Sequence, residues 1–163
     1  MSSYCPIASV LAYILNPERT HTLLVHRIAR PTDEQLGKYN GLGGHLERNE
    51  DIGTAIIREI REESTLEVTS MTFRGSINWT GFGPNGEDWI GFVFLVTGFT
   101  GTPCAKNEEG PLEWVPLDKI YDLPMWEGDR HFLPLVFDSD PRPFHGYMPY
   151  DNGRPLSWAF TRL

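Results

Sequence analysis

One charged segment limits what this chain can form more than any other feature. The segment runs from Gly43 to Leu66 and reads GGHLERNEDIGTAIIREIREESTL. A helix turns by about 100° per residue, so residues at i, i+3 and i+4 share one face. Three carboxylates of the segment have this spacing: Glu59, Glu62 and Glu63. The sequence therefore predicts an acidic cluster, and we take it as the candidate active site.

The apolar spacing of the segment predicts an amphipathic helix. A buried stripe that repeats every fourth residue is formed by Ile52, Ile56 and Ile60. Asn49 is the expected N-cap, and Glu50 and Asp51 place negative charge at the positive end of the helix dipole. The run of β-branched residues that begins at Thr65 predicts the change from helix to strand.

The acidic cluster has a simpler interpretation as well. A run such as REIREE also occurs on solvated helix faces, where i,i+4 ion pairs such as Arg58 with Glu62 stabilise the helix. The glycines that precede the helix favour a binding site instead. Gly41, Gly43 and Gly44 let the backbone turn tightly and approach a ligand, so their carbonyl oxygens can join a hard metal ion that the glutamates also hold.

Taken together, these positions resemble the Nudix box. The box is Gly, five residues, Glu, seven residues, Arg-Glu, an aliphatic residue, any residue, Glu-Glu, any residue, Gly and an aliphatic residue. It is matched by Gly44, Glu50, Arg58, Glu59, Ile60, Glu62, Glu63 and Leu66. Thr65 stands where the family has glycine, but every charged position is filled. The resemblance implies an α+β fold, with a curved mixed sheet between helices in an α/β/α sandwich, formed by a single domain over residues 1–163.

The resemblance also implies a reaction, which is metal-assisted hydrolysis of a phosphoric anhydride. By position in the box, Glu59, Glu62 and Glu63 would be metal ligands, Gly43 would offer its carbonyl, and Arg58 would orient a glutamate. An oxygen-rich site of this kind suits Mg²⁺ or Mn²⁺. Such an ion neutralises charge on a diphosphate and lowers the pKa of a bound water.

A further acidic residue from a loop outside the box commonly joins such a site, as a ligand or as the base. Glu109, in the stretch NEEGPLEW just ahead of an expected strand, is our candidate. Glu108 is the alternative, and either residue can instead be a solvated loop carboxylate.

Outside the box, the chain is similar to the MutT-type members that hydrolyse oxidised purine nucleoside triphosphates such as 8-oxo-dGTP to monophosphate and pyrophosphate. The stretches that carry this similarity are GKYNG, LEWVPLDKI, PMWEGD and FHGY. By position, Trp126 would stack on the purine, Asn40 and Asp129 would hydrogen-bond it, and Trp79 would form a second aromatic wall. The simpler alternatives are two core tryptophans, a turn-forming Asn40 and a helix-capping Asp129. Animal members have two adjacent aspartates where this chain has Gly128-Asp129, which bears on the choice between oxidised guanine and oxidised adenine.

Two other functions fit the same box. A Nudix hydrolase of a nucleotide sugar, a dinucleoside polyphosphate or a capped RNA end would keep the box and use different residues toward the base. A non-catalytic Nudix module would only bind a nucleotide, but the box carboxylates are all present here. We therefore expect a pyrophosphohydrolase that acts in nucleotide-pool sanitation.

Composition narrows the class of protein and its partners. The 163 residues are 40% hydrophobic, which is enough for one globular domain. A net charge of −8 argues against binding of duplex nucleic acid, which requires a basic surface. Cys5 and Cys104 lack metal-ligand spacing, so we expect free thiols in a reducing cytoplasm. No signal peptide or membrane-spanning run appears, and the expected partner is a nucleoside triphosphate; the sequence sets no oligomeric state.

The other elements are predicted from alternation and turn residues. Strands are expected at residues 7–15, 21–27, 67–79, 88–98 and 112–115. A helical turn is expected at 116–121, and a second helix at 127–138 despite Pro134. Residues 29–38 are expected to be irregular, and residues 144–150 and 154–160 to form a hairpin that turns at 151–153.

Overall fold

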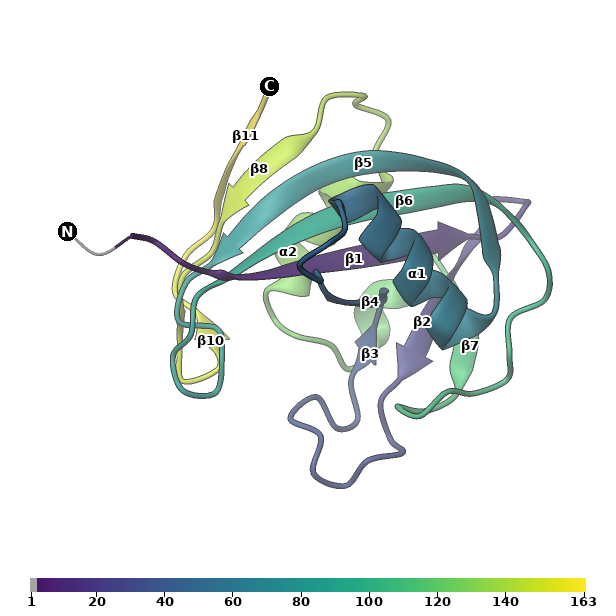
Figure 1. Cartoon of the computed structure of the whole chain (residues 1–163), viewed down its shortest axis with the longest axis horizontal. Helices are drawn as coiled ribbons and strands as arrows, with labels where there is room; N and C mark the ends of the chain where they lie inside the picture. The colour runs from purple at the N-terminus through teal and green to yellow at the C-terminus, as the bar shows by residue number, and fades with distance from the viewer. Residues whose placement is uncertain (1–2) are drawn as a thin grey trace.

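Three long strands form the frame of the molecule, and the computed structural model describes residues 3–163. β5 (Glu67–Trp79) pairs antiparallel with β6 (Trp89–Thr100), and β6 pairs in parallel with β1 (Ile7–Leu15). The nine-stranded sheet has the order β11-β8-β5-β6-β1-β2-β3, while β4 pairs with β1 and β7 with β2. The sheet is mixed, as the sequence predicts, and it is strongly curved (Figure 1).

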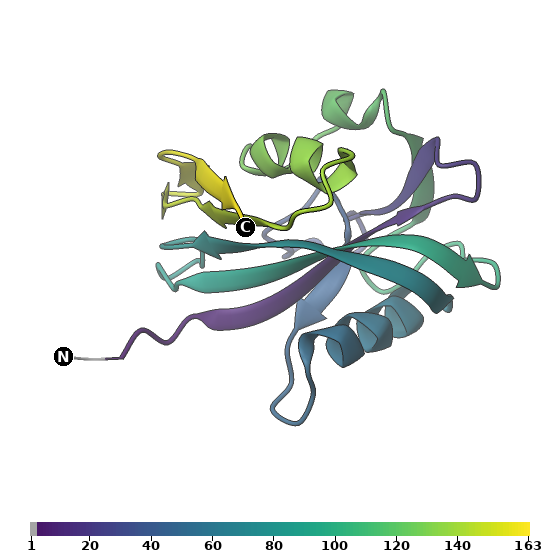
Figure 2. The ribbon, with the colours of Figure 1, turned by 90° about the horizontal axis from the view of Figure 1, so that it is seen from above.

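The shorter elements complete this sheet and cover it. The remaining strands are β2 (His21–His26), β3 (Tyr39–Asn40), β4 (Leu42–His45), β7 (Leu112–Pro116), β8 (Phe144–Tyr147), β9 (Tyr150–Asp151), β10 (Arg154–Pro155) and β11 (Ala159–Arg162). The helices are α1 (Ile52–Ser64), the 3₁₀ turn η1 (Ile120–Asp122) and α2 (Asp129–Phe137). Figure 2 shows α1 and α2 on opposite faces of the sheet, which confirms the expected α/β/α sandwich.

Each helix buries one apolar face against its own side of the sheet. Ile56 and Ile60 of α1 are fully buried in one core cluster, whereas Ile52, the first residue of the expected stripe, is only partly buried. On the other face, Phe132 and Val136 of α2 are fully buried in a second cluster. Two separate cores therefore fix the two helices, and each buried side chain of this size contributes about 1.5–3 kcal/mol.

The start of α1 differs from the prediction. Asp51, not Asn49, is the N-cap, and its side chain accepts hydrogen bonds from the backbone N–H groups of Gly53 and Thr54 at 2.8 and 3.0 Å. The helix begins at Ile52, so its first turn contains no acidic residue. Asparagine and aspartate are both good caps. Asp51 caps the helix here, since Glu50 turns back to accept a hydrogen bond from the N–H of Glu47 at 2.8 Å.

The glycine segment before α1 is also more regular than expected. Instead of a loop, Leu42–His45 form β4, in which Gly43 pairs with Leu11 of β1. A Cβ on Gly43 would overlap the carbonyl oxygen of Val10. Here glycine is required because the backbones of two strands approach closely, and this approach places β4 directly beside α1.

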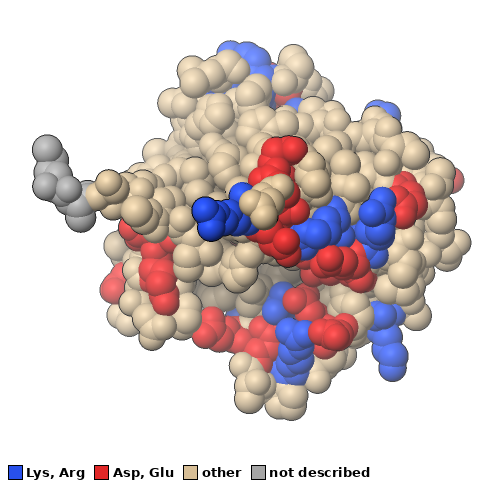
Figure 3. Space-filling view, in the orientation of Figure 1, with Lys and Arg blue, Asp and Glu red and all other residues tan. Residues whose placement is uncertain are grey.

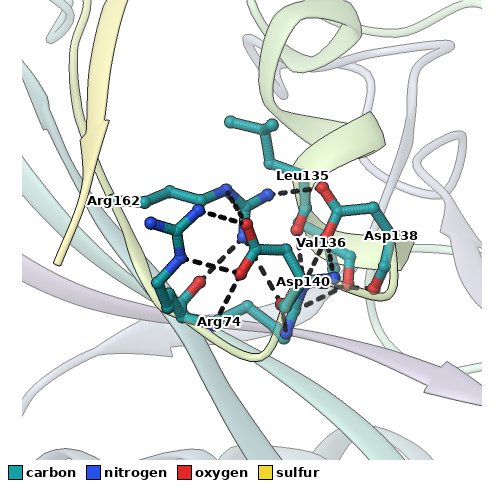
Figure 4. Close-up of polar contacts among 7 residues, drawn as sticks. Arg74, Leu135, Val136, Asp138, Asp140 and Arg162 are labelled. Carbon is teal, nitrogen blue, oxygen red and sulfur yellow. Dashed lines mark hydrogen bonds and ion pairs between the residues drawn. The ribbon is translucent and has the colours of Figure 1, made fainter.

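A buried arginine fixes the far end of α2. Arg74 of β5 is only 4% exposed, and it donates to the carbonyls of Leu135, Val136 and Asp140 and to the Asp138 carboxylate at 2.9–3.0 Å. Figure 4 shows Arg162 beside this group, where it also pairs with Asp138. These bonds satisfy the free carbonyls at the helix C-terminus. The helix starts at Asp129 rather than Glu127 and continues through Pro134.

The C-terminal hairpin is present in a modified form. Asn152 and Gly153 both have positive φ in the predicted turn, and β9 pairs with β10 around them. Farther out, β8 pairs with β11 and adds in parallel to the edge of β5. Among residues 3–163, no helix is long and apolar enough to cross a bilayer.

Candidate active site

A cleft of about 680 Å³ is lined by residues of both helices, of β1, β3 and β4, and of the loops beside them. All ten predicted site residues line it: Asn40, Gly43, Arg58, Glu59, Glu62, Glu63, Trp79, Glu109, Trp126 and Asp129. We call the part formed by Arg58, Glu59, Glu62, Glu63 and Glu109 the carboxylate end. The part formed by Asn40, Trp79, Phe82, Trp126, Asp129 and Tyr150 is the aromatic end. Figure 3 shows acidic and basic side chains interleaved over α1 and beneath it, around a hollow in the surface.

Arg58 organises the carboxylate end through a fan of ion pairs. Its guanidinium contacts Glu50 at 2.6 Å, Glu59 at 2.9 Å and Glu62 at 3.3 Å. It also donates to the carbonyl of His45 at 3.2 Å, which joins α1 to the end of β4. The hydrogen bond from Arg58 holds the pKa of the Glu50 carboxyl below its usual range. The predicted role of Arg58 in orienting glutamates is consistent with these contacts.

Glu63 is a partly buried box carboxylate that contacts β4. It accepts a hydrogen bond from the backbone N–H of Gly43 at 3.0 Å. Burial, followed by the nearby negative charges of Glu109 and Glu59, raises the pKa of the Glu63 carboxyl to about 8. Glu59 lies against Gly44, where any Cβ would collide with its carboxylate. Two carboxylates, those of Glu59 and Glu63, thus lie against glycine backbone in a partly desolvated place.

Glu109 approaches the same place from the loop before β7. Its carboxylate pairs with Arg27 at 3.0 Å, and burial raises its pKa. The loop is tied to α1 by Asn107, whose side chain donates to the carbonyl of Glu63 at 3.2 Å and accepts from the N–H of Glu109 at 2.9 Å. Glu108 does not line the cleft: its side chain is 89% exposed and pairs with Arg30. The geometry favours Glu109 over its neighbour.

The chemistry of these donors fits a hard divalent cation. Every candidate ligand is a carboxylate or carbonyl oxygen. Burial and then repulsion by Glu109 and Glu59 raise the pKa of Glu63, and a cation between the carboxylates would offset both. Within residues 3–163, no three acidic, histidine or cysteine side chains are already arranged as a complete metal centre. Glu59 and Glu62 turn toward Arg58 instead, so loading an ion requires side-chain rotation.

Phe82 is the central contact of the aromatic end. Its ring centroid lies 5.1–5.9 Å from those of Tyr150, Trp126, Trp79 and Trp89, in tilted or edge-to-face geometry. Trp79 is 9% exposed and also contacts Phe132 of α2, so it belongs both to the core and to the cleft wall.

Asp129 is the only carboxylate among the aromatic-end residues named above. Burial raises its pKa to about 7, against the opposing charge of Arg130. Its residue surface remains partly exposed because it lines the cleft, so some water reaches it. The preceding Gly128 is buried, and a Cβ there would overlap the Tyr150 hydroxyl. A side chain at position 128, as in an aspartate pair, would therefore require the side chains of Tyr150 and Met148 to move.

Sequence reasoning missed several residues that line the cleft. Among them are Arg27, Gln35, Phe82, Trp89 and Tyr150. Phe82 had a detectable signal, since it is the one large apolar residue within the turn-rich stretch GFGPNGE. The others reach the cleft only through long-range contacts, which neither periodicity nor turn chemistry reports.

The match to a family model agrees with this geometry. Residues 6–136 match the model of the NUDIX domain. The chain is 32% identical over 114 residues to the oxidized purine nucleoside triphosphate hydrolase of Danio rerio, covering 70% of each chain. It is 30% identical over 112 residues to the uncharacterized Nudix hydrolase YvcI of Bacillus subtilis, covering 66% of this chain and 69% of that one. The chain therefore belongs to the Nudix hydrolase family.

A solved structure supports the same fold. The MutT protein from Bacillus halodurans superimposes with a TM-score of 0.80 at 24% sequence identity, covering 94% of this chain and 97% of that chain. This likeness covers nearly the whole chain, so it confirms the expected fold class.

Proposed function

We propose that this protein is a Mg²⁺-dependent pyrophosphohydrolase that cleaves purine nucleoside triphosphates, preferably oxidised ones such as 8-oxo-dGTP, to monophosphate and pyrophosphate. One observation carries the proposal: a single cleft has acidic residues at one end and an aromatic, hydrogen-bonding set at the other. A nucleotide has the same two parts, an anionic phosphate chain and a flat base. The name of the Danio rerio relative supports the same substrate class.

The carboxylate end would hold the ion. Glu59, Glu62, Glu63 and the Gly43 carbonyl are the proposed ligands, with Glu109 as a further ligand or as the base that takes a proton from water. Bound Mg²⁺, for which Mn²⁺ can substitute, would neutralise phosphate charge and acidify an attacking water. Arg58 keeps Glu59 and Glu62 within reach by pairing with both. Arg27 holds Glu109 toward the cleft.

The aromatic end would hold the base. Trp126 offers its indole for stacking, Trp79 and Phe82 close the pocket, and Asn40 and Asp129 supply hydrogen-bonding groups. With a pKa of about 7, Asp129 carries a proton on a large share of molecules near neutral pH, so it can donate as well as accept. Cys5 and Cys104 are free thiols, which suits the reducing cytoplasm where we place the enzyme.

Product analysis tests the proposal directly. Pyrophosphate and phosphate release would be measured with Mg²⁺ on 8-oxo-dGTP, 2-hydroxy-dATP, dGTP, dATP, ADP-ribose and a diadenosine polyphosphate. We expect pyrophosphate, with kcat/KM highest for an oxidised purine. A preference for ADP-ribose or the dinucleotide would keep the Nudix chemistry and overturn the substrate. An absence of turnover on every compound would indicate a binding module.

The two neighbouring glutamates of the 107–110 loop provide a matched pair for the chemistry. Glu109→Gln removes a carboxylate that lines the cleft, and we expect kcat to fall by about tenfold or more. Glu108→Gln changes an exposed carboxylate in the next position and should leave kcat near the wild-type value. Equal losses in both variants would remove Glu109 from the proposed site.

A further inference from the structure

A polar contact joins the loop before β3 to the aromatic end of the cleft. The side-chain oxygen of Gln35 accepts hydrogen bonds from the Nδ2 of Asn40 and, at 3.3 Å, from the indole Nε1 of Trp126. Gln35 itself lines the cleft. The residue thus touches two of the side chains that we assign to the base.

The donor chemistry of tryptophan fixes the orientation of this contact. An indole N–H only donates, so the group of Gln35 that faces Trp126 must be its carbonyl oxygen. The same oxygen faces Asn40, which must therefore present its amide NH₂ rather than its oxygen. An amide oxygen has two lone pairs, and here both are used by protein donors.

The other half of the Gln35 amide is unused. Its Nε2 carries two N–H groups, and neither has a hydrogen-bond partner within residues 3–163. The contact therefore leaves Gln35, a cleft-lining residue, with only its two N–H donors free for a ligand. Asn40 retains its Oδ1 and one N–H for a ligand, because only one N–H is given to Gln35.

We propose that Gln35 is a specificity-determining residue that donates from Nε2 to a carbonyl oxygen on the purine edge. This inference rests on the proposed function and narrows its substrate to oxopurine nucleotides. A carbonyl at position 6 or position 8 accepts such a bond. An exocyclic amino group at the same place would bring two donors together and leave both unsatisfied, which is unfavourable in a partly buried site.

An isosteric variant tests the donor role. Gln35→Glu keeps oxygens for Trp126 and Asn40 but replaces the donating NH₂ with an acceptor. The values of kcat/KM would be measured for 8-oxo-dGTP, dGTP and 8-oxo-dATP. We expect kcat/KM for 8-oxo-dGTP to fall by about tenfold relative to kcat/KM for the analogue that lacks the recognised carbonyl. A change of this size corresponds to the loss of one buried hydrogen bond. A changed ratio to 8-oxo-dATP assigns the contact to position 6, and a changed ratio to dGTP assigns it to position 8.

Two further variants separate charge and structure from recognition. Leu36→Glu adds the same negative charge one residue along, on a 48% exposed side chain outside the cleft, and should shift all three substrates equally. Gln35→Met removes both the donor and the acceptor. The ratio of kcat/KM for 8-oxo-dGTP to that for the analogue without the carbonyl should therefore fall, and kcat/KM should also fall for every substrate. The thermal midpoint of each variant would confirm folding.

The outcomes are distinct. Wild-type turnover of oxidised purines with unchanged ratios in Gln35→Glu and Gln35→Met would overturn the role of Gln35 and leave the proposed function standing. Failure of the wild-type protein to hydrolyse any nucleoside triphosphate would overturn the proposed function itself.

Discussion

The two ends of the cleft are built in different ways. The carboxylate end is largely local: Glu59, Glu62 and Glu63 lie within two turns of α1, and β4 lies beside that helix. The aromatic end is assembled from four separate segments, which contribute Asn40, Trp79 with Phe82, Trp126 with Asp129, and Tyr150. A local site tolerates change elsewhere in the chain, whereas an assembled one depends on the packing of every segment. We therefore expect chemistry to be robust and substrate choice to be easily altered.

The largest effect should follow from a change at the carboxylate end. Glu63→Gln removes a central proposed ligand, and we expect kcat to fall by about a hundredfold or more. Folding should be retained or improved, since the variant no longer buries an ionisable group beside two other carboxylates. Steady-state kinetics and thermal unfolding with and without Mg²⁺ would check both parts. Glu67→Gln, an exposed change at the start of β5, is the control; equal kcat in the two variants would contradict the assignment.

A change at the aromatic end should instead depend on the substrate. Trp126→Ala removes the proposed stacking surface, and kcat/KM for oxidised purines should fall by about tenfold to a hundredfold, mostly through KM. Hydrolysis of a phosphoanhydride without a purine should be much less affected. Trp158→Ala removes a tryptophan that stacks on Phe160 away from the cleft, and should have little effect on either substrate. Uniform losses on all substrates would refute the division of the cleft into two ends.

This difference also explains what the sequence predicts well. Helix and strand periodicity are local properties, so the glutamate cluster, the long strands and the Asp151–Gly153 turn follow from residue spacing. Asp51 was missed as the N-cap because Asn49 is an equally good cap by residue type, and the contact of Glu50 with the N–H of Glu47 is not visible in the sequence pattern. β4 was missed because two glycines carry no strand propensity, and only the close approach to β1 makes them strand residues.

The aromatic end was predicted only in part, for a related reason. Trp126, Asn40 and Asp129 came from family resemblance, and residue spacing alone indicates none of them. Phe82 and Gln35 act through contacts with residues 44 and 91 positions away in the chain. Such contacts exist only after the sheet and α2 have packed, so the sequence pattern does not contain them.

The charge state of Asp129 should affect the free energy of unfolding, and this effect is smaller than the expected effects of Glu63→Gln and Trp126→Ala on activity. Its pKa rises from an ordinary value of 3.8 to about 7 on folding, because burial disfavours the carboxylate despite Arg130. The unfolded chain ionises first, so the stabilising contribution is complete below about pH 4, is lost as the pH rises to about 7, and is constant above that. The nearby Tyr13 and Tyr150 are neutral over this range, because burial raises the pKa of both.

A single substitution measures this loss. Asp129→Asn should be more stable than the wild type at pH 8, and its advantage should grow by about 1 kcal/mol between pH 5 and pH 8. Because water in the cleft partly solvates Asp129, this growth in stability is smaller than the full pKa shift would give. Urea unfolding at several pH values would check it, with the exposed Asp118→Asn as baseline. An advantage that does not vary with pH would show that the residue keeps an ordinary pKa in the folded protein.

The smallest effect concerns the exit from α1, where the carboxylate end departs from its family. Thr65 caps the helix with φ of 65°, a left-handed conformation that a β-branched residue adopts at a cost, and its N–H donates to the Arg61 carbonyl at 2.9 Å. Thr65→Gly relieves this strain but also makes the unfolded chain more flexible, so we expect a net gain of about 0.5 kcal/mol in the free energy of unfolding. Thr65→Ala keeps most of the strain and should gain less. If Thr65→Gly were no more stable than Thr65→Ala, backbone strain would not be what distinguishes this helix end. In both variants kcat should be unchanged, because the cap lies outside the cleft.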